Sequence, residues 1–144
     1  MRNVKIAAIQ MQCSTNLQTN LEKAEKMVRQ AAGDGAQIIL LPELLEREYF
    51  CQQRRYDFYH LAKPVEENDA VQMGMRLAKE LNVVLPISFY EQDINTLYNS
   101  IACIDADGTL SGVYRKTHIP DDHYYQEKFY FTPGNTGFKV FDTR

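Results

Sequence analysis

The sequence predicts an α/β fold, and three patterns near its start lead to this prediction. Residues 4–11 and 38–41 are two short apolar segments with the length and residue types of buried strands. Between them, apolar residues recur at helical spacing across residues 17–32. A strand, a helix and a strand in this order form a parallel unit with a right-handed crossover. The chain is therefore expected to begin as an α/β sheet.

The first helix has signals for its start and its stop. Thr19 and Glu22 have the spacing of a capping box, and Gly33 or Gly35 supplies the stop. The strand that follows is a continuous apolar run that Pro42 closes. These signals define one amphipathic helix between two strands.

A second helix and a third strand occupy the middle of the chain. The helix is predicted over residues 69–81, with Asn68 as its cap. Helical spacing places four side chains on its buried face: Val71, Met75, Ala78 and Leu81. The strand is predicted over residues 83–90, but Pro86 cannot donate a hydrogen bond to a sheet. A bend, a bulge or the start of the strand is therefore expected near Pro86.

The last third of the chain predicts a hairpin and a long loop. Residues 97–104 and 109–116 flank the turn sequence Asp-Ala-Asp-Gly and should form an antiparallel pair. Residues 117–137 form an aromatic loop that contains Pro and Gly. Residues 138–141 have the composition of a further strand.

Composition excludes several classes of protein. The 144 residues suit one domain, and 44% hydrophobic with 24% charged residues is typical of a folded, soluble chain. A net charge of -3 argues against nucleic acid as a partner, and the apolar runs are too short to cross a membrane. Cys13, Cys51 and Cys103 are widely spaced, so free thiols in a reducing, cytoplasmic compartment are expected.

Three charged residues are candidates for catalysis. Glu43 directly follows a buried strand, where a carboxylate can act as a general base in the ligand crevice of an α/β sheet. Lys116 ends another strand and could stabilise an oxyanion. Glu127 interrupts a run of aromatic residues, and a carboxylate buried there needs a partner such as Lys116. Each also has an ordinary interpretation: a helix-terminal carboxylate, a solvated lysine and a charged loop residue.

Metal and cofactor sites are not predicted. His118, Asp121, Asp122 and His123 are all metal-ligating residue types, but their spacing matches no metal motif. Residues 12–16, the turn after the first strand, contain no glycine, so a dinucleotide-binding loop is not expected either.

Four segments, in order, resemble the nitrilase superfamily of carbon–nitrogen hydrolases. They are Ala-Ala-Ile-Gln at residues 7–10, Gly-Ala-Gln-Ile-Ile-Leu-Leu-Pro-Glu at 35–43, Tyr-Arg-Lys-Thr-His-Ile-Pro at 114–120 and Phe-Tyr-Phe-Thr-Pro-Gly at 129–134. Residues 48–52 and 125–138 best match the N-carbamoylputrescine amidase branch. Residues 121–125, Asp-Asp-His-Tyr-Tyr, depart from the Gly- or Pro-containing turn expected there, which bears on loop shape and substrate fit.

The resemblance implies an αββα sandwich, with this chain as the N-terminal part of a single domain, truncated before the nucleophile turn. It implies a Glu-Lys-Cys triad in which Glu43 is the general base, Lys116 stabilises the oxyanion and Glu127 positions its neighbours. Candidate substrate-binding residues are Tyr49, Phe50 and His118. The superfamily's cysteine lies in a Cys-Trp-Asp-like motif, and this sequence contains no Trp.

The implied activity is hydrolysis of a linear carbon–nitrogen bond, best matched by N-carbamoylputrescine giving putrescine, carbon dioxide and ammonia. A β-ureidopropionase, an ω-amidase or an N-carbamoyl amino acid hydrolase would use the same triad. A non-catalytic remnant that serves as an oligomerisation or binding module is the alternative from another class. Without the nucleophile the chain alone should be inactive, and the complete chain is expected to form a homo-oligomer. Cys51, beside two aromatic residues, is expected at the pocket mouth but not as the nucleophile.

Overall fold

A computed structural model describes residues 3–144, and within that range it contains two α-helices and five strands. In chain order they are β1 (Ile6–Ala8), α1 (Leu17–Gly33), β2 (Ile38–Leu40), α2 (Asp69–Leu81), β3 (Leu85–Asp93), β4 (Thr96–Ile104) and β5 (Leu110–Arg115). Three short 3-10 helices lie between β2 and α2, namely η1 (Phe50–Gln52), η2 (Tyr56–Leu61) and η3 (Val65–Glu67), and a fourth, η4 (Glu127–Phe129), follows β5. The predicted α/β class is confirmed.

The strands form a mixed sheet in sequence order. β1 and β2 are parallel, with Ile6 opposite Ile38, as the strand-helix-strand pattern predicted. β3, β4 and β5 are antiparallel, which confirms the predicted β4–β5 hairpin and adds a β3–β4 hairpin. The two parts are joined because Ile39 N donates to Val84 O over 3.0 Å and Val84 N donates to Gln37 O over 2.8 Å. β3 spans Leu85–Asp93 and not the predicted residues 83–90, and its start beside Pro86 is one of the three outcomes expected there.

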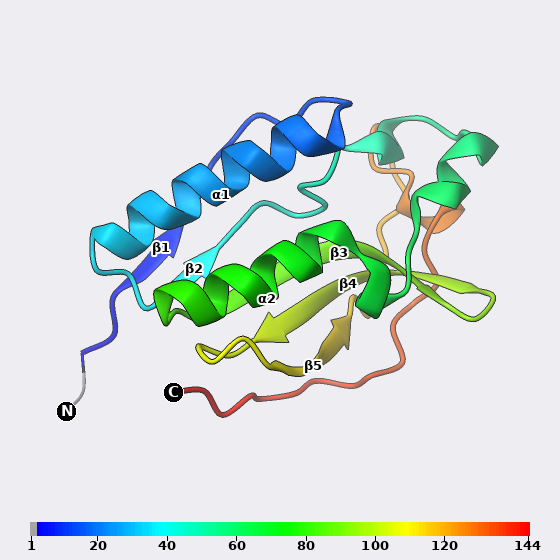
Figure 1. Ribbon diagram of the computed structural model, residues 1–144. Coiled ribbons are helices and arrows are strands. Elements are labelled where there is room, and N and C mark those ends of the chain that lie inside the picture. The colour runs from blue at the N-terminus through cyan, green and yellow to red at the C-terminus, as the bar shows by residue number, and fades with distance from the viewer. Residues whose placement is uncertain (1–2) are drawn as a thin grey trace.

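Both helices cover the same face of this sheet (Figure 1). α2 has the predicted bounds, and the Asn68 side chain accepts a hydrogen bond from Val71 N over 3.0 Å. The predicted capping box of α1 is wrong, because Asn16 is the cap and its side chain accepts from Thr19 N. α2 also buries Leu77, whereas Met75 is only half-buried.

The main core lies between the helices and the sheet. Alternate residues of β3 point into it, as the two-residue period of a strand requires. Gly74 lets α2 approach closely, since a Cβ there would lie 2.7 Å from Ile87 Cγ1. The buried side chains from helices and strands include Ala24, Val28, Ile39, Val71, Leu77, Leu85, Ile87, Phe89, Ala102 and Ile104.

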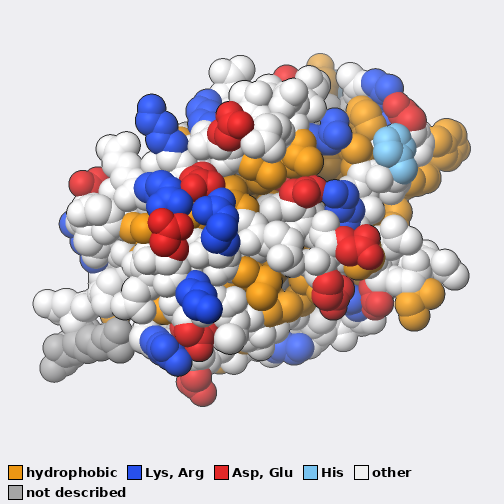
Figure 2. Space-filling view, in the orientation of Figure 1, with side chains coloured by type: hydrophobic (Ala, Val, Ile, Leu, Met, Phe, Trp, Pro, Cys, Tyr) orange, Lys and Arg blue, Asp and Glu red, His pale blue; other side chains and the backbone are white. Residues whose placement is uncertain are grey.

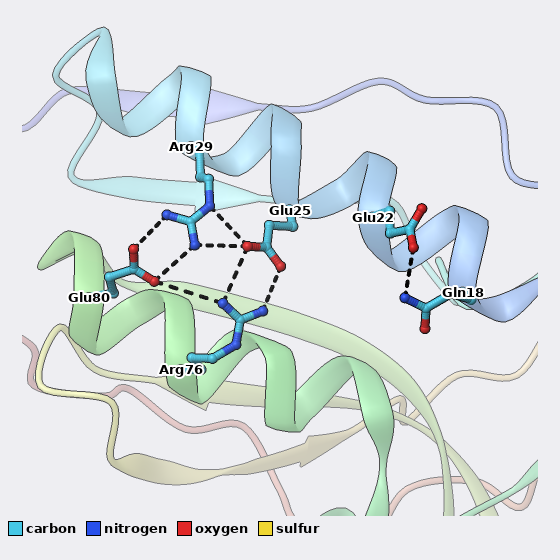
Figure 3. Close-up of polar contacts among 6 residues, drawn as sticks. All are labelled: Gln18, Glu22, Glu25, Arg29, Arg76 and Glu80. Atoms are coloured by element: carbon cyan, nitrogen blue, oxygen red, sulfur yellow. Dashed lines mark hydrogen bonds and ion pairs between the residues drawn. The ribbon is translucent and has the colours of Figure 1, made fainter.

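Four charged side chains also link α1 to α2 (Figure 3). Arg29 contacts Glu25 at 2.8 Å on its own helix and Glu80 at 2.7 Å on α2. Arg76 contacts Glu25 at 2.5 Å, so each helix contributes one cation and one anion. Figure 2 shows cationic and anionic side chains interspersed over this helix-covered face. These contacts lie at the surface and supplement the apolar packing beneath them.

Two sequence expectations are wrong. The first strand is shorter than predicted and is not buried, because no element of the described chain covers its second face, and Ile6 is 73% exposed. Residues 138–141 form no strand. They run beside β5 (Figure 1), where Phe138 stacks on Tyr114. No backbone hydrogen bond joins residues 138–141 to a strand of the described chain, and Val140 is 95% exposed.

A second, aromatic core lies at the end of the sheet that carries the β3–β4 turn. Phe50 and Tyr130 meet edge to face with ring centroids 5.0 Å apart, a favourable geometry for aromatic pairs. Its buried members are Leu44, Phe50, Cys51, Ala62, Tyr90, Ile119, Tyr130 and Phe131. This aromatic core fixes the segments that follow β2 and β5. Across residues 3–144, no helix has the length and apolar character needed to span a membrane.

Candidate active site

Three charged side chains from distant parts of the sequence meet beyond the ends of β2 and β5. Lys116 Nζ lies 3.0 Å from Glu43 Oε1, and it lies 3.1 and 2.8 Å from the two carboxylate oxygens of Glu127. The Glu127 side chain is 2% exposed, that of Lys116 31% and that of Glu43 46%. A single ammonium therefore bridges a buried carboxylate and a more accessible one. Glu43 is less desolvated than its position after a buried strand suggested.

Glu43 is held by the turn that follows β2. Leu44 has a φ of 52°, a left-handed conformation that costs a non-glycine residue roughly 1–2 kcal/mol. Its N–H donates to the buried Ser88 Oγ on β3 over 3.0 Å. The buried Asn20 of α1 donates to Glu46 O over 3.0 Å, so both the sheet and a helix hold the turn in place.

Lys116 is held by the residues around the end of β5. Its backbone N–H donates to Asn99 O over 2.8 Å, which continues the β4–β5 pairing by one residue. Its carbonyl accepts from Gly134 N over 2.9 Å. Gly134 packs directly on Arg115, and a Cβ at this position would overlap the Arg115 carbonyl oxygen. The backbone of Lys116 is thus fixed on both sides.

Glu127 is the first residue of η4 and lies against the aromatic core. Its carbonyl accepts from Tyr130 N and Phe131 N, each over 2.9 Å, which ties it to two buried rings. Tyr49 OH donates to Glu127 Oε1 over 2.6 Å. The buried carboxylate therefore has both a charged and a neutral donor, as a desolvated anion requires.

Asn99 is a site residue that the sequence reasoning missed. Its side-chain amide donates to Glu43 Oε1 over 2.7 Å, and the residue is 3% exposed. The sequence held only a weak signal, because Asn99 is a polar residue within a predicted strand and its neighbour Ser100 is polar and buried as well. Which residue it contacts depends on the pairing register and on the turn after β2, and neither was predicted.

The surroundings alter the proton affinity of Lys116 and Tyr49. Burial lowers the pKa of Lys116, but hydrogen bonds with Glu127 and Glu43 outweigh it, so the net pKa lies above its ordinary value. Burial raises the pKa of the Tyr49 hydroxyl, and its hydrogen bond to Glu127 raises it further. Lys116 is thus a cation and Tyr49 a protonated donor across the physiological range.

A cavity of about 220 Å³ opens beside these groups. Its lining includes Glu43, Lys116, Asn99, Ser88, Ile101 and Tyr114. The residues expected to bind substrate do not line it. The Tyr49 hydroxyl is bonded to Glu127, Phe50 is buried in the aromatic core, and His118 is exposed, with no side-chain hydrogen bond within the described chain.

Two of the three cysteines, Cys51 and Cys103, are buried, and Cys13 is half-buried. Burial raises the pKa of Cys51, Cys13 and Cys103 above the ordinary value, which disfavours the reactive thiolate. Cys51 is completely buried in the aromatic core, so its predicted place at the pocket mouth is wrong. No group of three or more potential metal ligands occurs among residues 3–144.

Comparisons with a family model and with known proteins agree on one family for this chain. Residues 5–144 match the family described as carbon-nitrogen hydrolase. An N-carbamoylputrescine amidase of Arabidopsis thaliana is 53% identical over 99% of this chain and 48% of its own length. A citrullinase of Francisella tularensis is 51% identical over 100% of this chain and 50% of its own. This chain therefore spans about half the length of these relatives.

A solved structure agrees with the sequence comparison. The crystal structure of a carbon-nitrogen hydrolase from Helicobacter pylori G27 superposes with a TM-score of 0.90 at 33% identity. The match covers 97% of this chain and 48% of that one. The arrangement of helices, strands and loops described above is therefore that of half of a known fold.

Proposed function

Because this chain belongs to the carbon-nitrogen hydrolase family, we propose that it contributes Glu43, Lys116 and Glu127 to an active site that hydrolyses a carbamoyl amide bond. The contact of one ammonium with two carboxylates, at 3.0 and 2.8 Å, is the observation that carries the proposal. A cation at that position can stabilise a developing oxyanion, and a carboxylate beside it can transfer protons. Glu127, almost completely buried, holds Lys116 in place.

The proposed nucleophile is a cysteine outside these 144 residues. Cys13, Cys51 and Cys103 are disfavoured because burial raises the pKa of each, and an attacking thiol must ionise. The chain is then the N-terminal part of a single domain, and the other half of the domain supplies the thiol. On this basis the isolated chain releases no ammonia from a ureido substrate.

In the proposed reaction, Glu43 accepts the thiol proton while the sulfur attacks the carbonyl carbon. Lys116 stabilises the oxyanion of the tetrahedral intermediate. The carbon–nitrogen bond to the terminal nitrogen breaks, Glu43 returns the proton, and ammonia leaves. Water then gives a proton to Glu43 and adds to the carbonyl carbon of the remaining thiocarbamate, the carbon–sulfur bond breaks, and the leaving sulfur takes the proton from Glu43 to restore the thiol. The carbamic acid formed decays to an amine and carbon dioxide.

The proposed substrate is a primary ureido compound with an alkyl chain. The names of the two relatives, N-carbamoylputrescine amidase and citrullinase, refer to substrates that share a terminal ureido group. They differ at the far end, where one carries an amine and the other an amino acid. N-carbamoylputrescine, with putrescine as the product, is the substrate we propose, because residues 48–52 and 125–138 match that branch of the family.

The test is ammonia release from N-carbamoylputrescine and from citrulline by the protein expressed at its full natural length. Glu43→Gln and Lys116→Met should each lower kcat at least about 100-fold. Matched controls are Glu48→Gln in the same turn and Lys128→Met beside Glu127, both exposed, which should retain activity. A stable protein that shows no turnover, and no change on replacement of Glu43 or Lys116, would instead indicate a binding module.

The proposal extends to location and assembly. Three free cysteines and a net charge of -3 suit a cytoplasmic protein. The exposed apolar side chains Ile6 and Leu40 lie on a sheet face that another layer of the complete domain would cover. A homo-oligomer is proposed for that complete protein, and light scattering at several concentrations would test it.

A further inference from the structure

The two oxygens of the Glu43 carboxylate have different surroundings. Asn99 Nδ2 donates to Oε1 over 2.7 Å, and Lys116 Nζ lies 3.0 Å from the same atom. Within residues 3–144, no hydrogen bond reaches Glu43 Oε2. Oε1 therefore has two donors, while Oε2 keeps its lone pairs available to accept a proton.

Asn99 contacts both Glu43, the proposed base, and Lys116, the residue proposed to stabilise the oxyanion. Its side chain binds Glu43, and its backbone carbonyl accepts the Lys116 N–H over 2.8 Å. It lies on β4, the central strand of the β3–β4–β5 part of the sheet, one residue from the paired Ser100 and Arg115. A short side chain on a rigid central strand leaves little freedom in the distance between Glu43 and Lys116.

We propose that Asn99 is a positioning residue that orients the Glu43 carboxylate so that Oε2 is the atom that takes the proton from the thiol and later from water. This inference rests on the proposed function, because it assigns an atom to a proton transfer in that reaction. Without the amide, the carboxylate can rotate about its terminal bond and exchange its two oxygens at Lys116. Proton transfer is then slower, because a fraction of the bound molecules lacks a correctly aimed acceptor.

The chemistry of asparagine suits this position. A carboxylate at residue 99 would repel Glu43, and a second cation there would compete with Lys116 for Oε1. The neutral amide donates a hydrogen bond to one Glu43 oxygen and so orients the carboxylate, without changing the net charge of the cluster formed by Glu43, Lys116 and Glu127. Near-complete burial keeps water from replacing this hydrogen bond.

The test compares Asn99→Leu, which nearly keeps the shape but lacks the donor, with Asn95→Leu in the exposed β3–β4 turn. In the full-length protein, Asn99→Leu should lower kcat about 10- to 100-fold, the usual effect of losing a hydrogen bond to a charged group. KM should change by less than about threefold, because the amide acts on the base and not on bound substrate. The acid limb of the kcat/KM profile should move to higher pH, since the ionised carboxylate loses a donor. Asn95→Leu should leave all three measurements unchanged.

A kcat and a pH profile of wild-type character in Asn99→Leu would overturn the inference. If Asn99→Leu does not fold, the test uses Asn99→Gln, which displaces the amide by one methylene group. This variant should lose kcat, though less than is expected for Asn99→Leu. A wild-type kcat and pH profile in Asn99→Gln would also overturn the inference. If the wild-type protein releases no ammonia from any ureido substrate, the proposed function fails, and the inference, which assigns an atom to that reaction, fails with it. If the wild-type protein turns over and Asn99→Leu keeps its kcat and pH profile, the inference alone fails and the proposed function stands.

Discussion

The Lys116 ammonium and the Glu127 carboxylate form an ion pair at 2.8 Å in which the carboxylate is almost completely removed from water. Lys116 belongs to the end of a strand and Glu127 to a short helix beside the aromatic core, so the pair also joins these two segments. A buried carboxylate that loses its cation is costly, and a cation that loses its carboxylate becomes mobile. The pair is therefore expected to affect both stability and catalysis.

Replacing Glu127 tests this ion pair directly. Glu127→Gln should lower kcat at least about 100-fold and destabilise the fold by about 1–2 kcal/mol, because Lys116 keeps one carboxylate and loses the other. The net pKa of Lys116 is raised in the folded state, so its contribution is fully present below the ordinary value of 10.5 and is lost as pH rises through the folded pKa. Urea unfolding at pH 7 to 11 should show the difference between wild type and variant flat at first and smaller at the alkaline end. A difference that grew with pH would contradict this account.

Tyr49 offers a milder change at the same carboxylate. Tyr49→Phe removes the hydroxyl that donates to Glu127 Oε1 over 2.6 Å and keeps the ring. Glu127 keeps its bonds to Lys116, so kcat should fall about 10-fold, with a loss of stability of about 1–2 kcal/mol. Tyr125→Phe is the matched control, because its exposed ring lies 5.9 Å from that of Tyr49 and should not affect kcat. Equal effects of the two variants would show that the hydroxyl at Tyr49 has no special role.

Several elements were predictable because the signals that define them are local. The bounds of α2 followed from the Asn68 cap and from helical spacing, and the β4–β5 hairpin followed from the turn at residues 105–108. The strand expected at residues 138–141 failed because a strand needs backbone partners, which composition does not reveal. The predicted buried face of α2 was partly wrong because the helix approaches the sheet at Gly74, and a glycine adds no side chain to an apolar pattern.

The candidate site was predictable in its charged members and not in its neutral ones. Glu43 and Lys116 lie in recognisable segments at strand ends, so their meeting could be anticipated. The contacts made by Asn99 and Ser88 depend on strand register and on the left-handed turn at Leu44, which are set by the tertiary fold. Phe50 appeared suited to a substrate pocket because aromatic residues serve both pockets and cores, and only the fold decides between them.

Arg115 and Glu91 form a buried ion pair on the helix-covered face of the sheet, opposite Lys116. Arg115 contacts Glu91 at 2.6 Å, both side chains are largely buried, and Ser100 Oγ donates to the same carboxylate. Arg115→Met leaves Glu91 without its cation and should destabilise the fold by about 3 kcal/mol. Arg55→Met removes an exposed pair with Asp57 and should cost much less stability, because solvent screens that pair. Chemical denaturation of both variants measures the two losses of unfolding free energy. Equal losses would show that burial of the Arg115–Glu91 pair is unimportant.

The link between α1 and α2 should respond to acid. Hydrogen bonds from Arg76 and then Arg29 lower the pKa of Glu25 to about 2 (Figure 3). Its folded-state pKa lies below the ordinary 4.5, so its contribution is present above that value and is lost as pH falls towards 2. Because the groups are near the surface, Glu25→Gln should cost only about 1 kcal/mol at pH 7, and the cost should vanish near the acid end. Glu22→Gln is the matched control on the same helix, because its partner is the neutral Gln18 and no ion pair is lost, so it should cost less stability at pH 7 than Glu25→Gln.

Gly134 should be required for the position of Lys116. Its N–H donates to the Lys116 carbonyl over 2.9 Å, and a Cβ would overlap the Arg115 carbonyl oxygen, which is backbone and cannot turn aside. Gly134→Ala must therefore move the loop away from β5, and kcat should fall at least about 10-fold as Lys116 shifts. Gly137 is the matched control, because its φ of 69° makes Gly137→Ala strained by roughly 1–2 kcal/mol although nothing lies within 4 Å of the new Cβ. Gly137→Ala should thus lose stability and keep kcat, whereas Gly134→Ala loses kcat. Kinetics and thermal unfolding of the two variants separate these effects, and a wild-type kcat in Gly134→Ala would mean that the loop does not position Lys116.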